Sequence, residues 1–215
     1  QERLANACER SGRKFSDVEL LAVSKTFPVE VIQEAVDAGQ TLFGENKVQE
    51  LLAKQPALPS KLRWHIIGHL QSNKVRKCLP LVQAIHSVDS LDLAQDINRI
   101  GGELGVFPKV YVEVNVAAES TKHGFKPEAL KQQLDALYKL DRLEIQGLMC
   151  IPPFDANVEQ CRRYFIFLRE LRDELEKLGG APLPKLSMGM SHDFEVAIEE
   201  GSTIVRVGSA IFGGR

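Results

Sequence analysis

Residues 19–44 of the chain read ELLAVSKTFPVEVIQEAVDAGQTLFG. An apolar run at Glu19–Ser24 predicts a buried strand, and Thr41–Gly44 predicts a second one. Between them, Val29–Ala38 has the pattern of a helix. A strand, a helix and another strand in this order indicate a parallel sheet with helices outside it.

The same alternation continues to the end of the chain. Further strands are predicted at Arg63–Ile67, Ala84–Val88, Lys109–Asn115, Glu144–Cys150, Leu186–Met188 and Thr203–Val207, and further helices at Lys47–Lys54, Leu91–Leu104, Pro127–Leu137 and Val158–Leu178. In the last helix, Val158, Cys161, Phe165, Leu168, Leu171 and Leu175 recur at the steps of one buried face. Eight strand–helix repeats without a linker predict the α/β class: one (β/α)8 TIM barrel domain over residues 1–215.

Composition narrows the function classes. The net charge is −2, with no basic stripe, so neither nucleic acid nor an anionic membrane is an expected partner. The four cysteines are scattered and predict reduced, buried thiols in a cytoplasmic protein. No apolar stretch is long enough to span a membrane. The chain begins at Gln1, which leaves open an organellar targeting segment before it.

In barrels of this kind, functional residues lie at the carboxyl ends of the strands and in the loops that follow. Polar side chains occur at these places, and we expect them to form one rim; they are Lys25, Glu45, Asn46, His69, His86, Ser87, Asp89, Asn115, Ser187–Ser191, Gly208 and Ser209.

The loops after the seventh and eighth strands predict a phosphate site. Ser191 precedes a helix expected near Phe194, and Gly208-Ser209 precede a final one around Ile211. Helix starts offer unpaired N–H groups to an anion, and serine adds a hydroxyl donor. Ordinary N-capping by serine is the alternative at each place.

Two basic residues have unusual positions. Arg206 lies within the eighth strand, where an unpaired guanidinium would be costly, so it either pairs with a nearby carboxylate or contacts a ligand below the phosphate. Lys25 follows the first strand, where it either extends to solvent or supplies the neutral amine of a Schiff base.

Other signals are weaker. His65 and His69 are four residues apart, but on a strand and its loop rather than on one helix, so no metal site is predicted. The terminal Gly-Ser-Ala-Ile-Phe-Gly-Gly lacks the lysine of a Walker loop, and no Gly-x-Ser-x-Gly elbow is present.

Several motifs resemble a known family. They are Val-Ser-Lys-Thr at 23–26, Phe-Gly-Glu-Asn at 43–46, Trp-His-Ile-Ile-Gly-His-Leu-Gln-Ser-Asn-Lys at 64–74, Gly-Leu-Met at 147–149, Leu-Ser-Met-Gly-Met-Ser at 186–191 and Gly-Ser-Thr-Ile-Val-Arg-Val-Gly-Ser-Ala-Ile-Phe-Gly at 201–213. In this order they are similar to the pyridoxal 5′-phosphate (PLP) homeostasis proteins, the YggS/PROSC family. His69 is the minor departure, since many members carry another residue there.

This resemblance implies a fold-type III PLP-binding barrel, like the N-terminal domain of alanine racemase. It implies a Schiff base at Lys25, a phosphate site at Ser191, Gly208 and Ser209, and Arg206 facing the pyridine nitrogen. Asn46 would lie near the cofactor, and we expect Met190 to be one of the cofactor-binding residues.

Three functions are possible, and one of them is binding of some other phosphorylated metabolite. The second is that of a non-catalytic carrier, buffer or regulator in PLP (vitamin B6) homeostasis, with PLP-dependent apoenzymes as recipients. The third is that of an amino-acid racemase of the alanine racemase type. Such an enzyme needs a second acid or base, which in alanine racemase-like enzymes is a tyrosine from an added domain. Tyr111, Tyr138 and Tyr164 are expected in a strand and two helices, away from the rim. The sequence therefore favours a non-enzymatic monomer.

Overall fold

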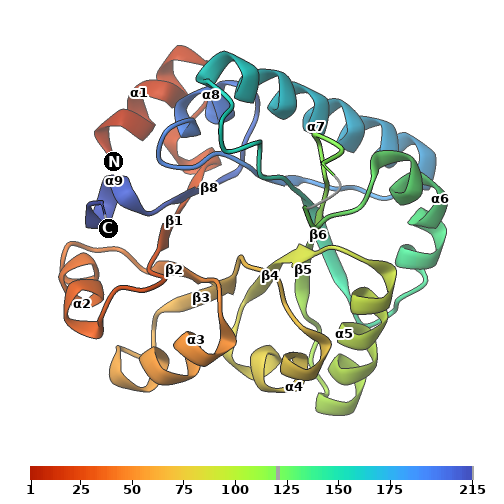
Figure 1. Cartoon of the computed structure of the whole chain (residues 1–215), viewed down its shortest axis with the longest axis horizontal. Coiled ribbons are helices and arrows are strands. Elements are labelled where there is room, and N and C mark those ends of the chain that lie inside the picture. Colours follow the sequence, from red (N-terminus) through yellow and green to blue (C-terminus); the bar gives the residue numbers. More distant parts are fainter. Residues whose placement is uncertain (120–121, 215) are drawn as a thin grey trace.

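The computed structural model describes residues 1–119 and 122–214; residues 120, 121 and 215 of the predicted domain lie outside this description. Eight parallel strands form a closed barrel in which each strand pairs with its neighbours in sequence and β1 closes on β8 (Figure 1). The strands are β1 (Glu19–Val23), β2 (Leu42–Glu45), β3 (Arg63–Ile66), β4 (Ala84–Val88), β5 (Lys109–Glu113), β6 (Glu144–Met149), β7 (Lys185–Ser187) and β8 (Ile204–Val207). The predicted (β/α)8 barrel is confirmed.

Helices surround the barrel as an outer ring (Figure 1). They are α1 (Glu2–Arg10), α2 (Val29–Asp37), α3 (Val48–Lys54), α4 (Val75–Cys78), α5 (Leu91–Leu104), α6 (Pro127–Tyr138), α7 (Val158–Gly179), α8 (Phe194–Glu199) and α9 (Ser209–Phe212), with short 3-10 turns at Phe15–Asp17, Gln55–Ala57, Ser72–Lys74 and Leu79–Leu81. The predicted helices agree with these bounds to within one residue.

Alternation along each strand separates the barrel interior from the layer under the helices. In β1, Leu21 and Val23 belong to the interior cluster, whereas Ala22 packs with the helix layer. The interior cluster consists of Leu21, Val23, Leu42, Ile67, Ala84, Tyr111, Met149 and Ile204. Space inside is narrow, because a Cβ on Gly44 would lie 2.4 Å from Leu21 Cδ2.

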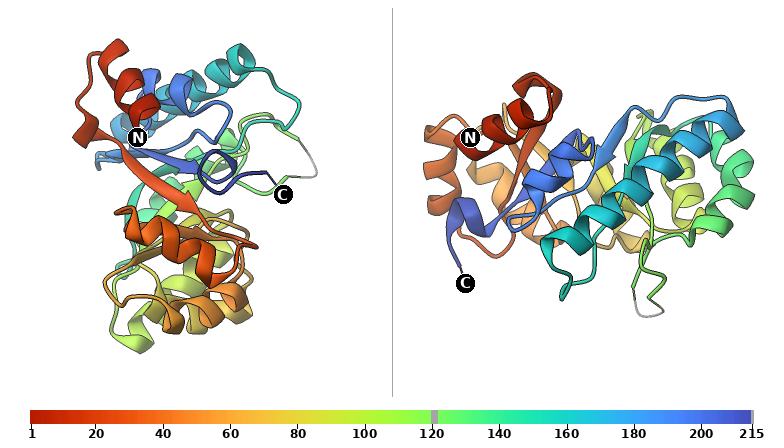
Figure 2. Two further views of the ribbon diagram at one scale, coloured as in Figure 1. Left: turned by 90° about the vertical axis from the view of Figure 1, so that its left-hand side faces the viewer. Right: turned by 90° about the horizontal axis from the view of Figure 1, so that it is seen from above.

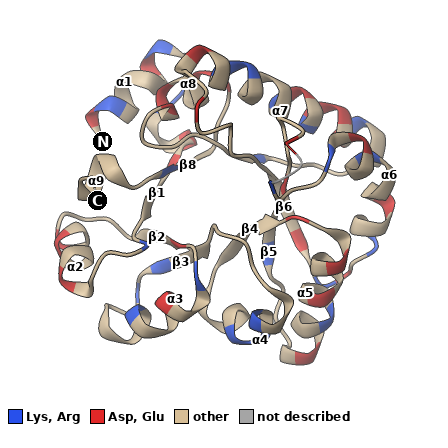
Figure 3. Ribbon diagram, in the orientation of Figure 1, with Lys and Arg blue, Asp and Glu red and all other residues tan. Residues whose placement is uncertain are grey.

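The outer helices carry one buried face and one charged face. In α7 the predicted apolar face is buried from Cys161 to Leu175, but Val158, at the first position of the helix, is 41% exposed, so its inclusion was wrong. Acidic and basic residues are interspersed on the long helices, and the described part of the chain shows no basic stripe (Figure 3). No helix in the described ranges is both long and apolar enough to cross a bilayer.

Most strands end earlier than predicted. Ser24, Ile67, Asn115, Cys150 and Met188 follow their strands instead of ending them, whereas β2 extends one residue further, to Glu45. These residues are still buried, and the amides of Ser24, Ile67, Cys150 and Met188 still donate to carbonyls of the neighbouring strands. The right-hand view of Figure 2 shows α9 and the described parts of the loop after β5 projecting from the same face of the barrel, the one at the carboxyl ends of the strands.

Candidate functional site

Lys25 lies in the turn that follows β1, two residues beyond Val23, and is partly buried. A buried hydrogen-bond network fixes the residue before it. Ser24 Oγ donates to Glu45 Oε1 at 2.7 Å, and Lys54 Nζ donates to the same oxygen at 2.8 Å and to the Ser24 carbonyl at 2.9 Å. The turn that carries Lys25 is therefore anchored to β2 and α3.

The residue after Lys25 is anchored by the same network. Thr26 has a φ of +68°, a left-handed conformation that is rare for a β-branched residue. Its amide donates to Glu50 Oε2 at 2.7 Å, and Lys54 Nζ donates to that oxygen at 2.8 Å. Burial alone would raise the pKa of Glu50, but these two hydrogen bonds lower it overall. Strain at a turn held from both sides is typical of a functional position.

Asn46 lies beyond β2 and lines a pocket of about 570 Å³. The other lining residues are Lys47, Val48, Gln49, His69, Leu70, Gln71 and Lys74. A Cβ on Gly68 would lie 2.7 Å from the Asn46 carbonyl oxygen, so only glycine allows the loops after β2 and β3 to approach this closely. The structure therefore places Asn46 at the mouth of the barrel, between β2 and β3.

The loops after β7 and β8 meet at Ser191. Its Oγ accepts hydrogen bonds from the amides of Gly208, at 3.1 Å, and Ala210, at 3.4 Å. Ser191 does not cap α8, whose N-cap is Asp193; it satisfies amides at the start of α9 instead. Ser209 is the exposed first residue of α9. Hydroxyl and amide groups from the two predicted loops thus lie together.

Met190 and Gly208 connect this corner to the rest of the barrel. The Met190 amide donates to Asp193 Oδ1. An added Cβ on Gly208 would lie 3.4 Å from Val23, which is two residues before Lys25. The end of β8 is therefore adjacent to the end of β1, as the closed barrel requires.

Arg206 points into the barrel, with 4% of its surface exposed. Its guanidinium donates to the carbonyls of Ser187, at 2.7 Å, and Cys150, at 2.8 Å, and to Ser187 Oγ at 2.6 Å. Burial lowers its pKa. Its hydrogen-bond partners are two carbonyls and a hydroxyl. The alternative that Arg206 pairs with a nearby carboxylate is therefore not what the hydrogen bonds show.

A chain of hydrogen bonds continues from Arg206 across the barrel. Ser187 Oγ lies 2.7 Å from His86 Nδ1, and His86 Nε2 lies 2.8 Å from His65 Nδ1. Since the guanidinium can only donate to Ser187 Oγ, the serine proton is available to His86. Burial lowers the pKa of His65 to about 4 and that of His86 well below its usual value. Both rings are neutral near pH 7 and serve to orient Ser187 and Arg206.

Several of the polar residues expected at the rim are buried instead. His86 and Ser187 are buried in the barrel interior, below the mouth. Glu45 is also fully buried and bonds to Lys54 of α3. Each lies on a strand rather than in the loop after it, so alternation and not position at the strand end decides where the side chain points.

The three tyrosines lie in a strand and two helices, as predicted. Tyr111 lies inside the barrel, stacked on His86 at 4.3 Å, and Tyr138 belongs to α6, as expected. Tyr164, on α7, lines a pocket of about 400 Å³ with Ala117 and Pro153, residues of the loops after β5 and β6. The lining of this pocket includes none of the residues predicted for the rim, and Tyr164 lies in a helix as expected.

Glu113, the last residue of β5, is a buried carboxyl group at the mouth. Desolvation raises its pKa from 4.5 to about 7, helped by the negative charge of Asp89 and opposed by Arg206 and His69. Between these two pH values the folded state binds a proton that the unfolded state does not. The stability from this group is therefore complete below pH 4.5 and is lost as the pH rises through about 7.

Replacing Glu113 by glutamine is expected to remove this pH dependence. The free energy of unfolding of the native chain, minus that of the variant, should fall by up to about 1.4 kcal/mol per pH unit from pH 4.5 to 7. His65 titrates in this range with the opposite sign, so the difference between proteins, measured by urea unfolding, is the informative quantity. Changing the exposed Glu144 to glutamine is the control, and an equal slope in both variants would contradict the assignment.

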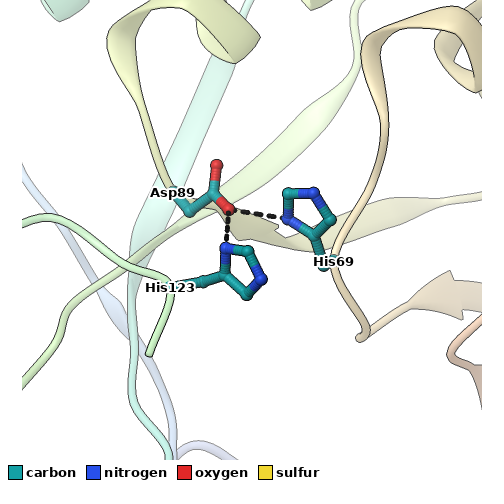
Figure 4. Close-up of side chains that lie close together, drawn as sticks. All are labelled: His69, Asp89 and His123. Atoms are coloured by element: carbon teal, nitrogen blue, oxygen red, sulfur yellow. Dashed lines mark hydrogen bonds and ion pairs between the residues drawn. The ribbon is translucent and has the colours of Figure 1, made fainter. Parts of the chain in front are cut away.

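Two groups of interacting residues were not predicted as units. One is the network of Ser24, Glu45, Glu50 and Lys54 described above. The other joins His69, Asp89 and His123 from the loops after β3, β4 and β5 (Figure 4). Glu45, His69 and Asp89 were recognised as strand-end polar residues, which was the available signal, but their partners lie on other elements.

The arrangement divides the mouth chemically. Beside β1, β7 and β8 lie an amine, a guanidinium, hydroxyls and backbone amides, which suit a phosphate and a carbonyl compound. Beside β3, β4 and β5 lie imidazoles and carboxylates. The donor groups of the first side fit the PLP implied by the sequence motifs.

Comparison with known proteins gives consistent results. The chain matches the family model described as alanine racemase, N-terminal domain, over residues 1–215. It is 49% identical to the pyridoxal phosphate homeostasis protein of Aquifex aeolicus, covering 100% of this chain and 94% of that protein. With the protein of the same name from Pseudomonas aeruginosa it shares 44% identity over 99% of this chain and 91% of the relative.

A solved structure extends the comparison. PipY of Synechococcus elongatus PCC7942, with PLP bound, superposes with a TM-score of 0.87 at 42% identity, and each chain covers 99% of the other.

Proposed function

Since this chain belongs to the pyridoxal phosphate homeostasis proteins, a family with the alanine racemase N-terminal domain, we propose that it binds PLP through a Schiff base at Lys25 and acts as a carrier or buffer of that cofactor. The single observation that supports the proposal is that the Ser191–Gly208 corner lies against Val23, two residues before Lys25, while Arg206 of the adjacent β8 points into the same barrel.

Each cofactor group has a candidate partner. Ser191, Ser209 and the Gly208 amide would hold the phosphate, with Met190 beside them, because they supply hydroxyl and N–H donors. Arg206, oriented by Ser187, would face the ring nitrogen. Asn46 would contact the cofactor from the β2 side. When bound, PLP supplies an electron sink for carbanions, and an arginine beside its ring nitrogen weakens that sink by disfavouring protonation.

Positions of the tyrosines support a non-catalytic role. Racemisation requires an acid or base on each face of the substrate. Tyr111 is buried and stacked below the mouth, and Tyr164 lies at β5 and β6, across the barrel from Lys25 at β1. We infer that the protein holds PLP as a monomer and passes it to PLP-dependent apoenzymes.

Two assays separate carrier from racemase. Loaded protein should racemise amino acids no faster than free PLP at the same concentration, and it should restore activity to a PLP-free apoenzyme even when a scavenger removes free PLP. Robust turnover that is lost in Tyr164→Phe would instead identify a racemase. A chain that stays colourless after PLP is added would indicate another phosphorylated ligand.

Replacing Ser191 by alanine tests the phosphate corner. The substitution removes a hydroxyl donor and the acceptor of the Gly208 and Ala210 amides, so PLP should bind about tenfold more weakly, equivalent to about 1.4 kcal/mol. Binding is measured by titration of the visible absorption. Pyridoxal, which lacks the phosphate, is the matched ligand and should lose no affinity; an equal loss for both ligands would argue against a phosphate contact.

A further inference from the structure

The loops after β3, β4 and β5 bring two imidazoles to one carboxylate. His69 Nδ1 lies 2.8 Å and His123 Nδ1 lies 3.3 Å from the same Asp89 oxygen, Oδ2 (Figure 4). The two rings stack with their centres 4.0 Å apart. All three ligand atoms lie within 4.8 Å of one another. This group, the His69–Asp89–His123 cluster, lies on the far side of the mouth from the start of α9.

These separations approach those of a tetrahedral zinc site. Ligand atoms about 2.0–2.1 Å from zinc lie roughly 3.3 Å from each other. The His123–Asp89 distance of 3.3 Å already has this value, and the His69–Asp89 distance of 2.8 Å needs to widen slightly. The two rings, which stack with an interplanar angle of 13°, would also have to turn so that both Nδ1 atoms point at one ion. Two nitrogen ligands with one carboxylate oxygen are a set that Zn²⁺ accepts, with a fourth position left for water.

Hydrogen bonds within the protein hold the loops that carry the ligands. Asn115 Nδ2 donates to the Glu119 carbonyl at 2.7 Å, and the Phe125 amide donates to the Glu113 carbonyl at 2.8 Å, so the loop bearing His123 is tied to β5. A Cβ on Gly124, whose φ is +107°, would lie 2.8 Å from the Asn115 nitrogen. On the other side, Ser87 Oγ donates to the Gly68 carbonyl at 2.6 Å and fixes the residue before His69.

Exposure suits a site that an ion can enter. The side chains of His69 and His123 are 44% and 59% exposed, whereas Asp89 is 8% exposed. An exposed imidazole–carboxylate contact contributes little to folding, so stability alone does not account for two imidazoles on one oxygen. Asp89 brings negative charge to the cluster.

We propose that His69, Asp89 and His123 form a binding site for Zn²⁺ or a divalent transition-metal ion of similar ligand preference. The two Nδ1 atoms and Asp89 Oδ2 are the ligands, and the remaining position is open to water. The sequence-based prediction compared only His65 with His69, whereas the residues that contact His69 come from two other loops.

The test is a titration of full-length protein that carries no polyhistidine tag and has been treated with chelator. Zn²⁺ binding is followed by calorimetry, and Co²⁺ serves as a probe because its visible bands report a tetrahedral site. One ion per chain is expected. His69→Ala and His123→Ala should each weaken binding by more than about tenfold, since a lost ligand costs at least as much as a lost supporting contact.

His192→Ala is the matched control, because His192 is also exposed and lies with Cys161 and Asp193 in a second group of possible ligands. It should leave binding unchanged. No binding at millimolar ion, unchanged affinity in both cluster variants, or loss of binding in His192→Ala would each overturn the proposal. If bound PLP rather than the cluster coordinates Zn²⁺, binding of the ion will persist in the double variant His69→Ala, His123→Ala. That result would also overturn the proposal.

Discussion

Protein with Lys25 replaced by alanine is expected to show no visible absorption band of protein-bound PLP after incubation with the cofactor. A Schiff base requires a primary amine, and the neighbours of Lys25 are held in place by Glu45, Glu50 and Lys54, so another lysine is not expected to take over its position. Residual binding through the Ser191 corner should remain weak and reversible on gel filtration. Absorption spectra before and after desalting measure both effects.

Lys14→Ala is the control for this prediction, because Lys14 is exposed and lies before β1, at the opposite end of that strand from Lys25. It should retain the spectrum of the native chain. A native spectrum in Lys25→Ala that survives desalting would contradict the assignment of the Schiff base.

The second large effect concerns the network beneath Lys25. Replacing Lys54 by methionine removes the cation that donates to Glu45, Glu50 and the Ser24 carbonyl. The Glu45 side chain is fully buried, and breaking a buried pair costs about 3–5 kcal/mol of folding free energy. Desolvation already raises the pKa of Glu45, although hydrogen bonds from Lys54 and Ser24 lower it. Without Lys54 this pKa should rise further. Urea unfolding at neutral pH measures the loss.

Two further variants give this prediction its controls. Lys139→Met changes an exposed lysine at the end of α6 and should alter stability by less than about 0.5 kcal/mol. The double variant Glu45→Gln, Lys54→Met should recover part of the loss, because it leaves no buried charge. A loss below about 1 kcal/mol in Lys54→Met, as for a surface pair, would contradict the buried network.

The fold could be predicted because its signal is local. Apolar runs such as Glu19–Val23 and helical periodicity such as that of Leu91–Leu104 are properties of neighbouring residues, and their repetition determines the barrel. Strand ends were less accurate, since Cys150 and Met188 remain buried beyond their strands. Both amides also still donate to carbonyls of the neighbouring strands, so a buried, hydrogen-bonded residue can lie one position outside a strand.

The site could be predicted only in part. Ser191 and Gly208 meet because parallel strands bring successive loops to one edge, which the sequence order implies. Ser191 capping α9 rather than α8 depends on the path of two loops that no spacing rule describes. Glu45 with Lys54, and His69 with Asp89 and His123, are contacts between different elements, so spacing along one element contains no information about them.

The most direct test of the proposed function is to locate the covalent attachment of PLP. Native protein loaded with PLP is reduced with borohydride, digested and analysed by mass spectrometry. The account predicts a phosphopyridoxyl group on the peptide containing Lys25, in near-stoichiometric amount, and little on any other lysine. A label spread over several lysines, or located on a lysine other than Lys25, would contradict it.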